Sequence, residues 1–372
     1  MTITEKMPMK RLETSQLVPG MITAEDVYTY NGQLILSKGL TLNDKAITRL
    51  ELYSILTIRI EESTAEIEFE LLDPDDSNPD EWPFSKIIKN SPQFKEFQKS
   101  FDETLERFRS NLNDIVEKGA PVDLSNMLKD TIALFEKSTG AAQFFNMLHN
   151  MRTYDDLTFA HSLNVSLICN VFAGWLMMSK DDIELATACG LFHDLGKLAI
   201  PDDIIKKNGK LTDEEYEIVK THTIQGYQFL KNQHISDHVK NAALMHHERN
   251  DGSGYPLAIK GDRIDKYAKI VAIADVYDAM TAARVYRGPL CPFKVIEIFE
   301  KEGFQKYETQ YILTFLENVV LTYMNNRVRL NDGTIGEIIY INKSHLSRPM
   351  IKTSSSFIDL SKESSLYIDA IL

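Results

Sequence analysis

Apolar residues recur at helical spacing through most of the chain, and this pattern constrains the fold more than any other feature. The first long example consists of Phe94, Phe97, Phe101, Leu105 and Phe108. These side chains are three and four residues apart, so they share one face of an amphipathic helix. The stretch 124–135 repeats the pattern, and few strand signals occur between 141 and 325. The sequence therefore predicts a mainly α protein.

Two shorter units flank the helical part. In the first, Asn31-Gly32 separates two strand-like stretches, which is a hairpin signal, and 41–53 has helical periodicity. In the last, Asn331-Asp332-Gly333 marks a second hairpin, and about 45 residues are too few for a large core, so this unit should pack on the helices. The predicted organisation is a small α+β domain (1–62), an acidic linker with three prolines (63–90), connecting helices (91–140), an all-helical domain (141–326) and a small β module (327–372).

The composition restricts the environment and the partners. The formal net charge of −13 over 372 residues argues against binding to polymeric nucleic acid or to an anionic membrane. The three cysteines are far apart and predict free thiols in a reducing compartment. The first eleven residues lack the apolar segment of a secretion signal, and the most apolar stretch, 165–178, is too short to span a bilayer. We therefore expect a cytoplasmic protein.

Histidine and aspartate side chains occupy the apolar helical stretches in a pattern typical of a metal site. The members are His161, His193, Asp194, His222, His246, His247 and Asp275. Each alone has an ordinary explanation, such as a hydrogen-bonded core histidine or a carboxylate paired with an arginine. Together they are costly to bury unless they bind metal or one another. Imidazole and carboxylate suit iron, manganese, zinc or nickel better than calcium or magnesium, and a carboxylate can bridge two ions that cleave phosphoesters.

Three sequence runs resemble the signatures of metal-dependent phosphohydrolases. The run 193–197 reads HDLGK and is similar to the HD-domain signature, while 246–256 reads HHERNDGSGYP and is similar to the HD-GYP signature. The run 274–281 and the arginines after it also look like HD-GYP proteins. The resemblance covers about 150–320. It implies an all-helical HD-GYP domain that hydrolyses cyclic di-GMP to pGpG and/or GMP.

Carried over residue by residue, the resemblance implies two divalent metal ions, most often Fe or Mn in this family. The first would be held by His161, His193, Asp194 and Asp275, and the second by Asp194, His222, His246 and His247. Asp194 would bridge the two ions. A metal-bound hydroxide between them is the expected nucleophile.

Lys197 is a candidate catalytic residue beside Asp194. It follows Asp194 by three residues, so it projects from a neighbouring face if the helix continues there. In that position it could bind the scissile phosphate and stabilise the charge that develops on it. The alternative is a solvated lysine.

The candidate substrate contacts are Gly254, Tyr255, Pro256, Arg284 and Arg287. The glycine permits a tight turn or a close approach to substrate. Tyr255 could stack on a base or pack the loop in place. The resemblance places the two arginines near guanine or phosphate, and surface salt bridges are the alternative.

One position departs from the family pattern. Some members bind a third metal ion through a Glu one turn before the first His, and here that position is Leu157. Asp155 and Asp156 fall on other faces of a regular helix. This favours two ions, and it leaves pGpG and GMP both open as the final product.

Three other functions compete with cyclic di-GMP hydrolysis. One is hydrolysis of another cyclic dinucleotide such as cyclic GMP-AMP, and a second is a weakly active metal-binding sensor or interaction module. A third, an alarmone or nucleotide hydrolase of the wider HD group, is disfavoured by the Gly-Tyr-Pro loop. The N-terminal unit resembles a small domain of unknown function that often precedes HD-GYP domains. We expect it to serve a homodimer contact or a regulatory protein partner.

Overall fold

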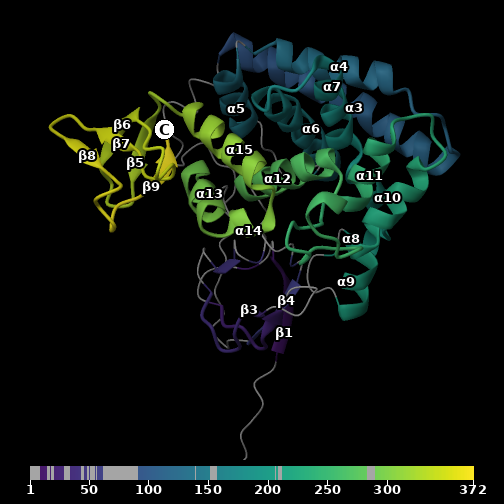
Figure 1. The fold of residues 1–372 in the computed structure, drawn as a ribbon, viewed down its shortest axis with the longest axis horizontal. Coiled ribbons are helices and arrows are strands. Elements are labelled where there is room, and N and C mark those ends of the chain that lie inside the picture. The colour runs from purple at the N-terminus through teal and green to yellow at the C-terminus, as the bar shows by residue number, and fades with distance from the viewer. Residues whose placement is uncertain are drawn as a thin grey trace, which may run out of the picture.

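The structure is a computed structural model, and its helices form one large body with small β units at two of its sides (Figure 1). It describes residues 9–14, 17, 21–28, 34–42, 46–47, 50, 55, 57–61, 91–138, 140–150, 157–205, 207, 212–282 and 290–372. The expected acidic linker (63–90) lies outside these residues.

The helical body confirms the mainly α prediction. Its elements are α3 (Pro92–Lys118), α4 (Leu124–Glu136), α5 (Ala141–Asn150), α6 (Leu157–Trp175), α7 (Lys180–Phe192), η2 (Leu195–Ala199), α8 (Asp202–Ile205), α9 (Asp213–Lys220), α10 (His222–Leu230), α11 (Asp237–Met245), η3 (Gly261–Arg263), α12 (Lys266–Thr281), α13 (Pro292–Ile298), η4 (Phe299–Gly303), α14 (Phe304–Lys306) and α15 (Thr309–Leu321). Between 141 and 326, the described ranges contain no strand. Over the whole of the described chain, no helix combines the length and the apolar character needed to cross a membrane.

Helix α3 begins and ends where its sequence dictates. Ser91 is extended and its side chain accepts a hydrogen bond from the Phe94 amide at 3.1 Å, with a proline at the first helical position. Gly119 ends the helix in the left-handed conformation, at φ 64°. The apolar face is buried as the spacing predicts, through Phe94, Phe97, Phe101 and Phe108.

Helix α12 is the central element of the core. It is buried on every side, which is typical of a helix enclosed by other helices. Helices α6, α7, α11 and α15 all contact it. Two of its buried residues are Asp275 and Asp278, so both carboxylates lie in the interior and need polar partners there.

The N-terminal unit is built from two antiparallel strand pairs. Strands β1 (Met9–Glu13) and β4 (Thr57–Glu61) form one pair, and β2 (Val27–Tyr28) and β3 (Leu34–Leu36) form the other. The predicted hairpin strands are confirmed, whereas β1 was not predicted. Residues 46, 47 and 50 are helical within the predicted 41–53 helix. The Asn31-Gly32 turn lies outside the described residues. This unit has a hydrophobic core of its own.

The C-terminal unit is a five-stranded antiparallel sheet in the order β8-β7-β6-β5-β9. Its strands are β5 (Arg327–Leu330), β6 (Ile335–Tyr340), β7 (Met350–Lys352), β8 (Phe357–Asp359) and β9 (Ile368–Ile371). Its inward residues, such as Val328 and Ile338, belong to the same hydrophobic cluster as the helices. In addition, the Glu300 carboxylate accepts hydrogen bonds from the Leu346 and Ser347 amides. The sheet thus packs on the helical body, as expected from its small size.

Candidate metal centre

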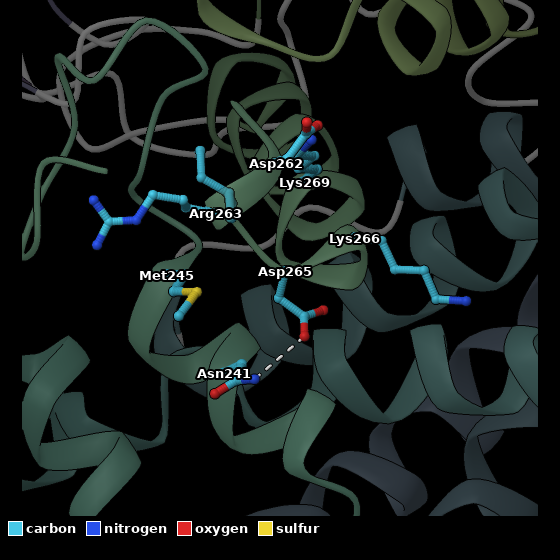
Figure 2. Close-up of a pocket in the computed structure, with 8 residues that line it drawn as sticks. Asn241, Met245, Asp262, Arg263, Asp265, Lys266 and Lys269 are labelled. Carbon is cyan, nitrogen blue, oxygen red and sulfur yellow. Dashed lines mark hydrogen bonds between the residues drawn. The ribbon is translucent and has the colours of Figure 1, made fainter. Parts of the chain in front are cut away.

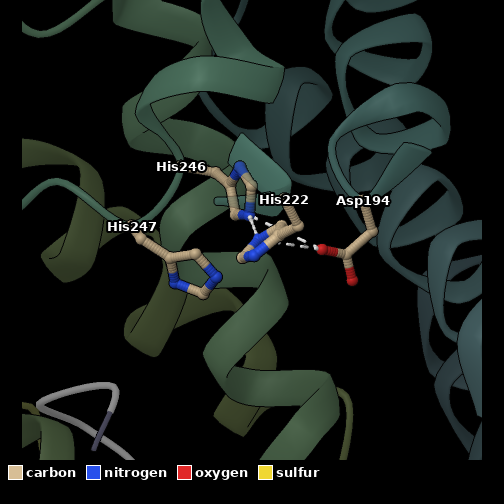
Figure 3. Close-up of side chains that lie close together, drawn as sticks. All are labelled: Asp194, His222, His246 and His247. Atoms are coloured by element: carbon tan, nitrogen blue, oxygen red, sulfur yellow. Dashed lines mark hydrogen bonds and ion pairs between the residues drawn. The ribbon is translucent and has the colours of Figure 1, made fainter. Parts of the chain in front are cut away.

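Most of the predicted metal ligands converge from five helices and their ends. His161 lies on α6, His193 and Asp194 at the junction of α7 and η2, His222 at the start of α10, His246 and His247 directly after α11, and Asp275 on α12. Two groups have ligand atoms within 4.8 Å of one another: Asp194 with His222, His246 and His247, and Asp194 with His161 and His193. Figure 3 shows the first group, with His222 and His246 both directed at one carboxylate oxygen.

Asp194 belongs to both groups, and its two oxygens face different histidines. Oδ1 lies 3.5 Å from Nε2 of His222 and 3.6 Å from Nε2 of His246. Oδ2 lies 3.3 Å from Nε2 of His193 and 3.7 Å from Nε2 of His161. The two histidine groups therefore meet at this one carboxylate.

Three of the imidazoles are held with Nε2 toward the centre. The Nδ1 atoms of His193, His222 and His246 lie 2.7, 2.8 and 3.1 Å from backbone carbonyl oxygens of the preceding helical turn. A carbonyl can only accept, so each Nδ1 carries a proton and each Nε2 is left directed at the centre. The Nε2 atoms of His222 and His246 are only 3.3 Å apart, so their lone pairs face each other.

The interior leaves two of these polar atoms without protein partners. Within the described part of the chain, Nε2 of His193 and Oδ1 of Asp194 are buried and make no hydrogen bond. Buried polar atoms without partners are costly, and a cation coordinated by them would satisfy both. Nitrogen and carboxylate ligands together fit a divalent transition metal.

Burial also sets the protonation state that a metal requires. It lowers the pKa of His222 to about 3, and it lowers the pKa of His246 as well. Burial and the neighbouring His246 hold the pKa of His247 well below its usual range. These imidazoles are therefore neutral at pH 7, which is the form that binds metal.

Lys197 forms a close ion pair with Asp194. Its Nζ atom lies 2.5 Å from Oδ2 of Asp194. Burial alone would raise the pKa of Asp194, but nearby positive charge, above all that of Lys197, outweighs it and holds that pKa well below its usual range. The sequence prediction for Lys197 assumed that the helix containing His193 continues through Lys197. Helix α7 does not continue that far. It ends at Phe192, and Lys197 lies on the 3₁₀ turn η2, where residues three apart are eclipsed.

Gly196 explains why η2 can lie against α10. A Cβ atom at this position would stand 1.8 Å from the carbonyl oxygen of His222 and 2.5 Å from the backbone nitrogen of Gly226. No side chain could fit between the two backbones. The glycine of the HDLGK run therefore brings Asp194 close to His222.

His161 has carboxylate partners at both ring nitrogens. Its Nε2 atom lies 3.0 Å from Oδ1 of Asp275, and its Nδ1 atom lies 2.8 Å from Oδ2 of Asp278. Burial alone would lower the pKa of His161, but these two carboxylates outweigh it and raise the pKa to about 9. The sequence prediction did not include Asp278. Asp278 could have been found from its spacing, because it follows Asp275 by three residues on a helix that is buried on every side.

The Gly-Tyr-Pro turn folds back on His247, a predicted ligand. Tyr255 is 4% exposed, and its ring stacks on His247 with centroids 4.6 Å apart and planes 23° apart. A Cβ atom on Gly254 would lie 2.3 Å from the carbonyl oxygen of His247, so only glycine allows this approach. The Tyr255–Pro256 peptide is cis. The close approach is made to the chain's own backbone, and Tyr255 packs the turn onto His247, a predicted ligand.

A family model described as HD domain matches residues 123–310, just over half of the chain. This matched region contains every member of the His/Asp cluster. The chain belongs to the HD-domain family. The run from His246 to Pro256 places it in the HD-GYP group of that family.

The HD-GYP protein also matches curated proteins over part of their length. It is 33% identical over 207 residues to cyclic di-GMP phosphodiesterase PA4108 of Pseudomonas aeruginosa, covering 55% of this chain and 50% of that protein. It is 36% identical over 172 residues to 3'3'-cGAMP-specific phosphodiesterase 1 of Vibrio cholerae, covering 45% of this chain and 40% of that protein. The chain thus spans half or less of the length of these two relatives. A solved structure of Bd1817 from Bdellovibrio bacteriovorus, titled an HDG"Y"P protein, aligns with a TM-score of 0.46 and 18% identity, covering 84% of this chain and 99% of that one.

A separate pocket of about 420 Å³ lies on the HD domain where α11 ends and α12 begins (Figure 2). It contains two lysines, but their charges are already paired. Lys266 lies 3.2 Å from Asp182, and Lys269 lies 2.8 Å from Glu308. No side chain of the His/Asp cluster lines this pocket.

Some predicted residues of the HD-GYP site lie outside the described residues. These are Arg284 and Arg287, together with Asp155, Asp156 and the side chain of Leu157. Their predicted roles stay predictions.

Proposed function

We propose that this HD-GYP protein hydrolyses a phosphodiester bond of a cyclic dinucleotide, with cyclic di-GMP as its substrate. The observation that carries the proposal is the placement of Asp194 between two groups of buried histidines. Two relatives named as cyclic dinucleotide phosphodiesterases support the substrate class.

The ligand set suits two divalent ions, Fe or Mn, that share Asp194. The first ion would be held by His161, His193, Asp194 and Asp275, and the second by Asp194, His222, His246 and His247. When bound, these ions would activate water for attack on the phosphorus and neutralise phosphate charge. The net charge of −13 gives the protein no general attraction for an anion, so this local positive charge is needed.

We propose that Lys197, which is paired with Asp194 in this structure, binds a phosphate oxygen of the substrate when metal is present. Its ammonium now neutralises Oδ2 of Asp194, at 2.5 Å. When cations take over that neutralisation, the ammonium can turn to a phosphate oxygen and stabilise the charge that develops there. It is 26% exposed, so its side chain has room to move.

The substrate would lie along the turn that covers the second group of ligands. Gly254, Tyr255 and Pro256 form this turn, and the hydroxyl of Tyr255 makes no hydrogen bond to the described residues. That hydroxyl is buried, so Tyr255 would shape the substrate site through its packing on His247. Arg284 and Arg287 are proposed to contact guanine or phosphate through bidentate hydrogen bonds.

A second candidate substrate is 3'3'-cyclic GMP-AMP, because one relative is named as specific for it. Exchange of one guanine for adenine alters only a few hydrogen-bonding groups, so a single side-chain contact can decide between the two substrates.

A substrate panel tests the proposal. Metal-loaded wild-type protein is incubated anaerobically with cyclic di-GMP, cyclic GMP-AMP or cyclic di-AMP, and the products are separated by chromatography. Asp194→Asn removes the shared charge, and Asp262→Asn, at an exposed carboxylate on η3, is the matched control. We expect hydrolysis of cyclic di-GMP by wild type and control and none by Asp194→Asn. Equal turnover by all three proteins would rule out the His/Asp cluster as the active site. Turnover of cyclic GMP-AMP alone would show that cyclic GMP-AMP, and not cyclic di-GMP, is the substrate.

A further inference from the structure

The segment before the Gly-Tyr-Pro turn is held by a lysine 55 residues away in the chain. Lys306 lies on α14, and its side chain is only 1% exposed. Its ammonium donates to Oδ2 of Asp251 at 2.6 Å and to Oγ of Ser253 at 3.0 Å. Both acceptors lie just before Gly254 of the Gly-Tyr-Pro turn, so one buried cation holds two residues of the segment 251–256.

Two further contacts join the same parts of the chain. The amide of Asn250 donates to the carbonyl oxygen of Lys306 at 2.7 Å. The guanidinium of Arg249 lies over the ring of Tyr307, 5.2 Å from its centroid. Lys306 and Tyr307 together therefore contact four residues between 249 and 253.

A buried lysine is a costly way to fill space. Taking an ammonium out of water is unfavourable, and apolar side chains of the same volume are often more stabilising. The charge is nevertheless satisfied by directed hydrogen bonds, which fix the distance between α14 and the turn. This favours a role in geometry over a role in overall stability.

The fixed segment leads directly to the residues that cover the metal centre. Two residues after Ser253, the ring of Tyr255 stacks on His247. On the other side of the turn, the carboxylate of Glu248 accepts hydrogen bonds from the amides of Leu257 at 2.6 Å and Ile259 at 3.2 Å. The turn is thus held at both ends, and Lys306 holds the end that precedes the tyrosine.

We propose that Lys306 is a positioning residue that holds the turn 251–256 over the metal centre, and thereby sets substrate affinity. The effect on substrate affinity rests on the proposed function. The ligand His246 is held independently, because its Nδ1 atom lies 3.1 Å from the Ala242 carbonyl oxygen in α11. Loss of Lys306 should therefore loosen the turn without removing the ligands.

Lys306→Met tests the proposal, because it keeps the chain length and removes the charge. The carboxylate that it leaves, Asp251, is 29% exposed and can be hydrated. The control is Lys301→Met on η4, where a 54% exposed lysine pairs with Glu297 four residues away. The first measurement is amide hydrogen exchange in full-length metal-loaded protein, resolved for 251–257. The second is the KM and kcat for cyclic di-GMP.

We expect exchange in 251–257 to become about tenfold faster or more in Lys306→Met, since a hydrogen bond to a charged group is lost. KM should rise while kcat and metal content change little, and Lys301→Met should match wild type. Unchanged exchange would overturn the positioning role. Faster exchange with an unchanged KM would overturn the link to substrate.

Two outcomes need separate readouts. If wild-type protein hydrolyses no cyclic dinucleotide, the proposed function fails, while hydrogen exchange alone still decides whether Lys306 holds the turn. If Lys306→Met does not fold, Ser253→Ala replaces it, because it removes one of the two ammonium partners without leaving a charge unpaired. It should accelerate exchange in 251–257 in the same direction, and normal exchange would contradict the proposal.

Discussion

The carboxylate of Asp278 and the imidazole of His161 are joined by a 2.8 Å contact between Oδ2 and Nδ1, across the interface of α6 and α12. Because Asp278 occupies Nδ1, the other nitrogen of the ring is directed at Asp275. A carboxylate behind a ligating histidine orients the ring and increases its basicity. In the proposed site, Asp278 would thereby prepare His161 to bind metal.

Asp278→Asn should weaken binding of one metal ion by about 10–100-fold, because the amide cannot supply the same charge or ring orientation. The control is Asp265→Asn. The Asp265 carboxylate caps the start of α12 and lies 2.7 Å from Nδ1 of His238 on α11, outside the metal cluster. Asn also caps a helix, so α12 keeps its start. Anaerobic metal titration compares the three proteins. Equal affinities in all of them would exclude this role for Asp278.

The metal-free protein should lose stability at high pH through His161. Its pKa is raised from an ordinary value of 6.5 to about 9 by Asp275 and Asp278. The stabilising contribution of the protonated ring is therefore complete below pH 6.5 and disappears as the pH rises through about 9. Metal must displace that proton, so metal affinity should rise over the same interval.

Urea unfolding in the presence of a chelator at pH 6.5 and pH 9.5 measures this effect. The free energy of unfolding of wild type should fall by up to a few kcal/mol more than that of His161→Gln. Identical pH dependence in the two proteins would show that His161 is not protonated in the metal-free state.

Lys197→Ala should act differently on the metal-free and the metal-loaded protein. Without metal, it removes the cation 2.5 Å from buried Asp194 and should lower the melting temperature. With metal, the melting temperature should change less, while kcat falls on the order of 10²–10³-fold. Lys207→Ala is the control, since Lys207 pairs with Glu215 at 2.7 Å on the protein surface. An unchanged kcat in Lys197→Ala would show that Lys197 only neutralises Asp194 and has no role in catalysis.

The metal content and the product should follow from Leu157. An apolar side chain offers no lone pair where a third-metal Glu would stand, so we predict two metal ions per chain. Cutting the linear product needs a second placement of phosphate, which is held less well without a third cation. Linear pGpG should therefore accumulate before GMP appears. Three ions per chain, or GMP released without pGpG, would contradict this prediction.

Much of the fold followed from local sequence patterns. Helix α3 could be predicted because Phe94 and Phe101 repeat at helical spacing, and β5 and β6 because a turn signal separates two apolar stretches. The His/Asp cluster could be predicted because ionisable side chains such as His161 are rare on apolar helices unless they have partners.

The remaining features depend on contacts between distant parts of the chain. The η2 turn that places Lys197 over Asp194 follows from packing against α10, which no local spacing reveals. Lys306 resembles any surface lysine until α14 brings it against Asp251. Likewise, no local pattern marks the division between α9 and α10 at Thr221, which places His222 at the start of α10.

The role of Asp194 is tested most directly by measuring cyclic di-GMP hydrolysis and metal content in the same anaerobic samples of wild type and Asp194→Ala. We expect wild type to carry metal and to produce pGpG. The variant should lose both metal and turnover, because two cations would face each other without a shared anion. A variant that keeps two ions per chain and turns over normally, or a fully metal-loaded wild type that leaves cyclic di-GMP intact, would contradict this expectation.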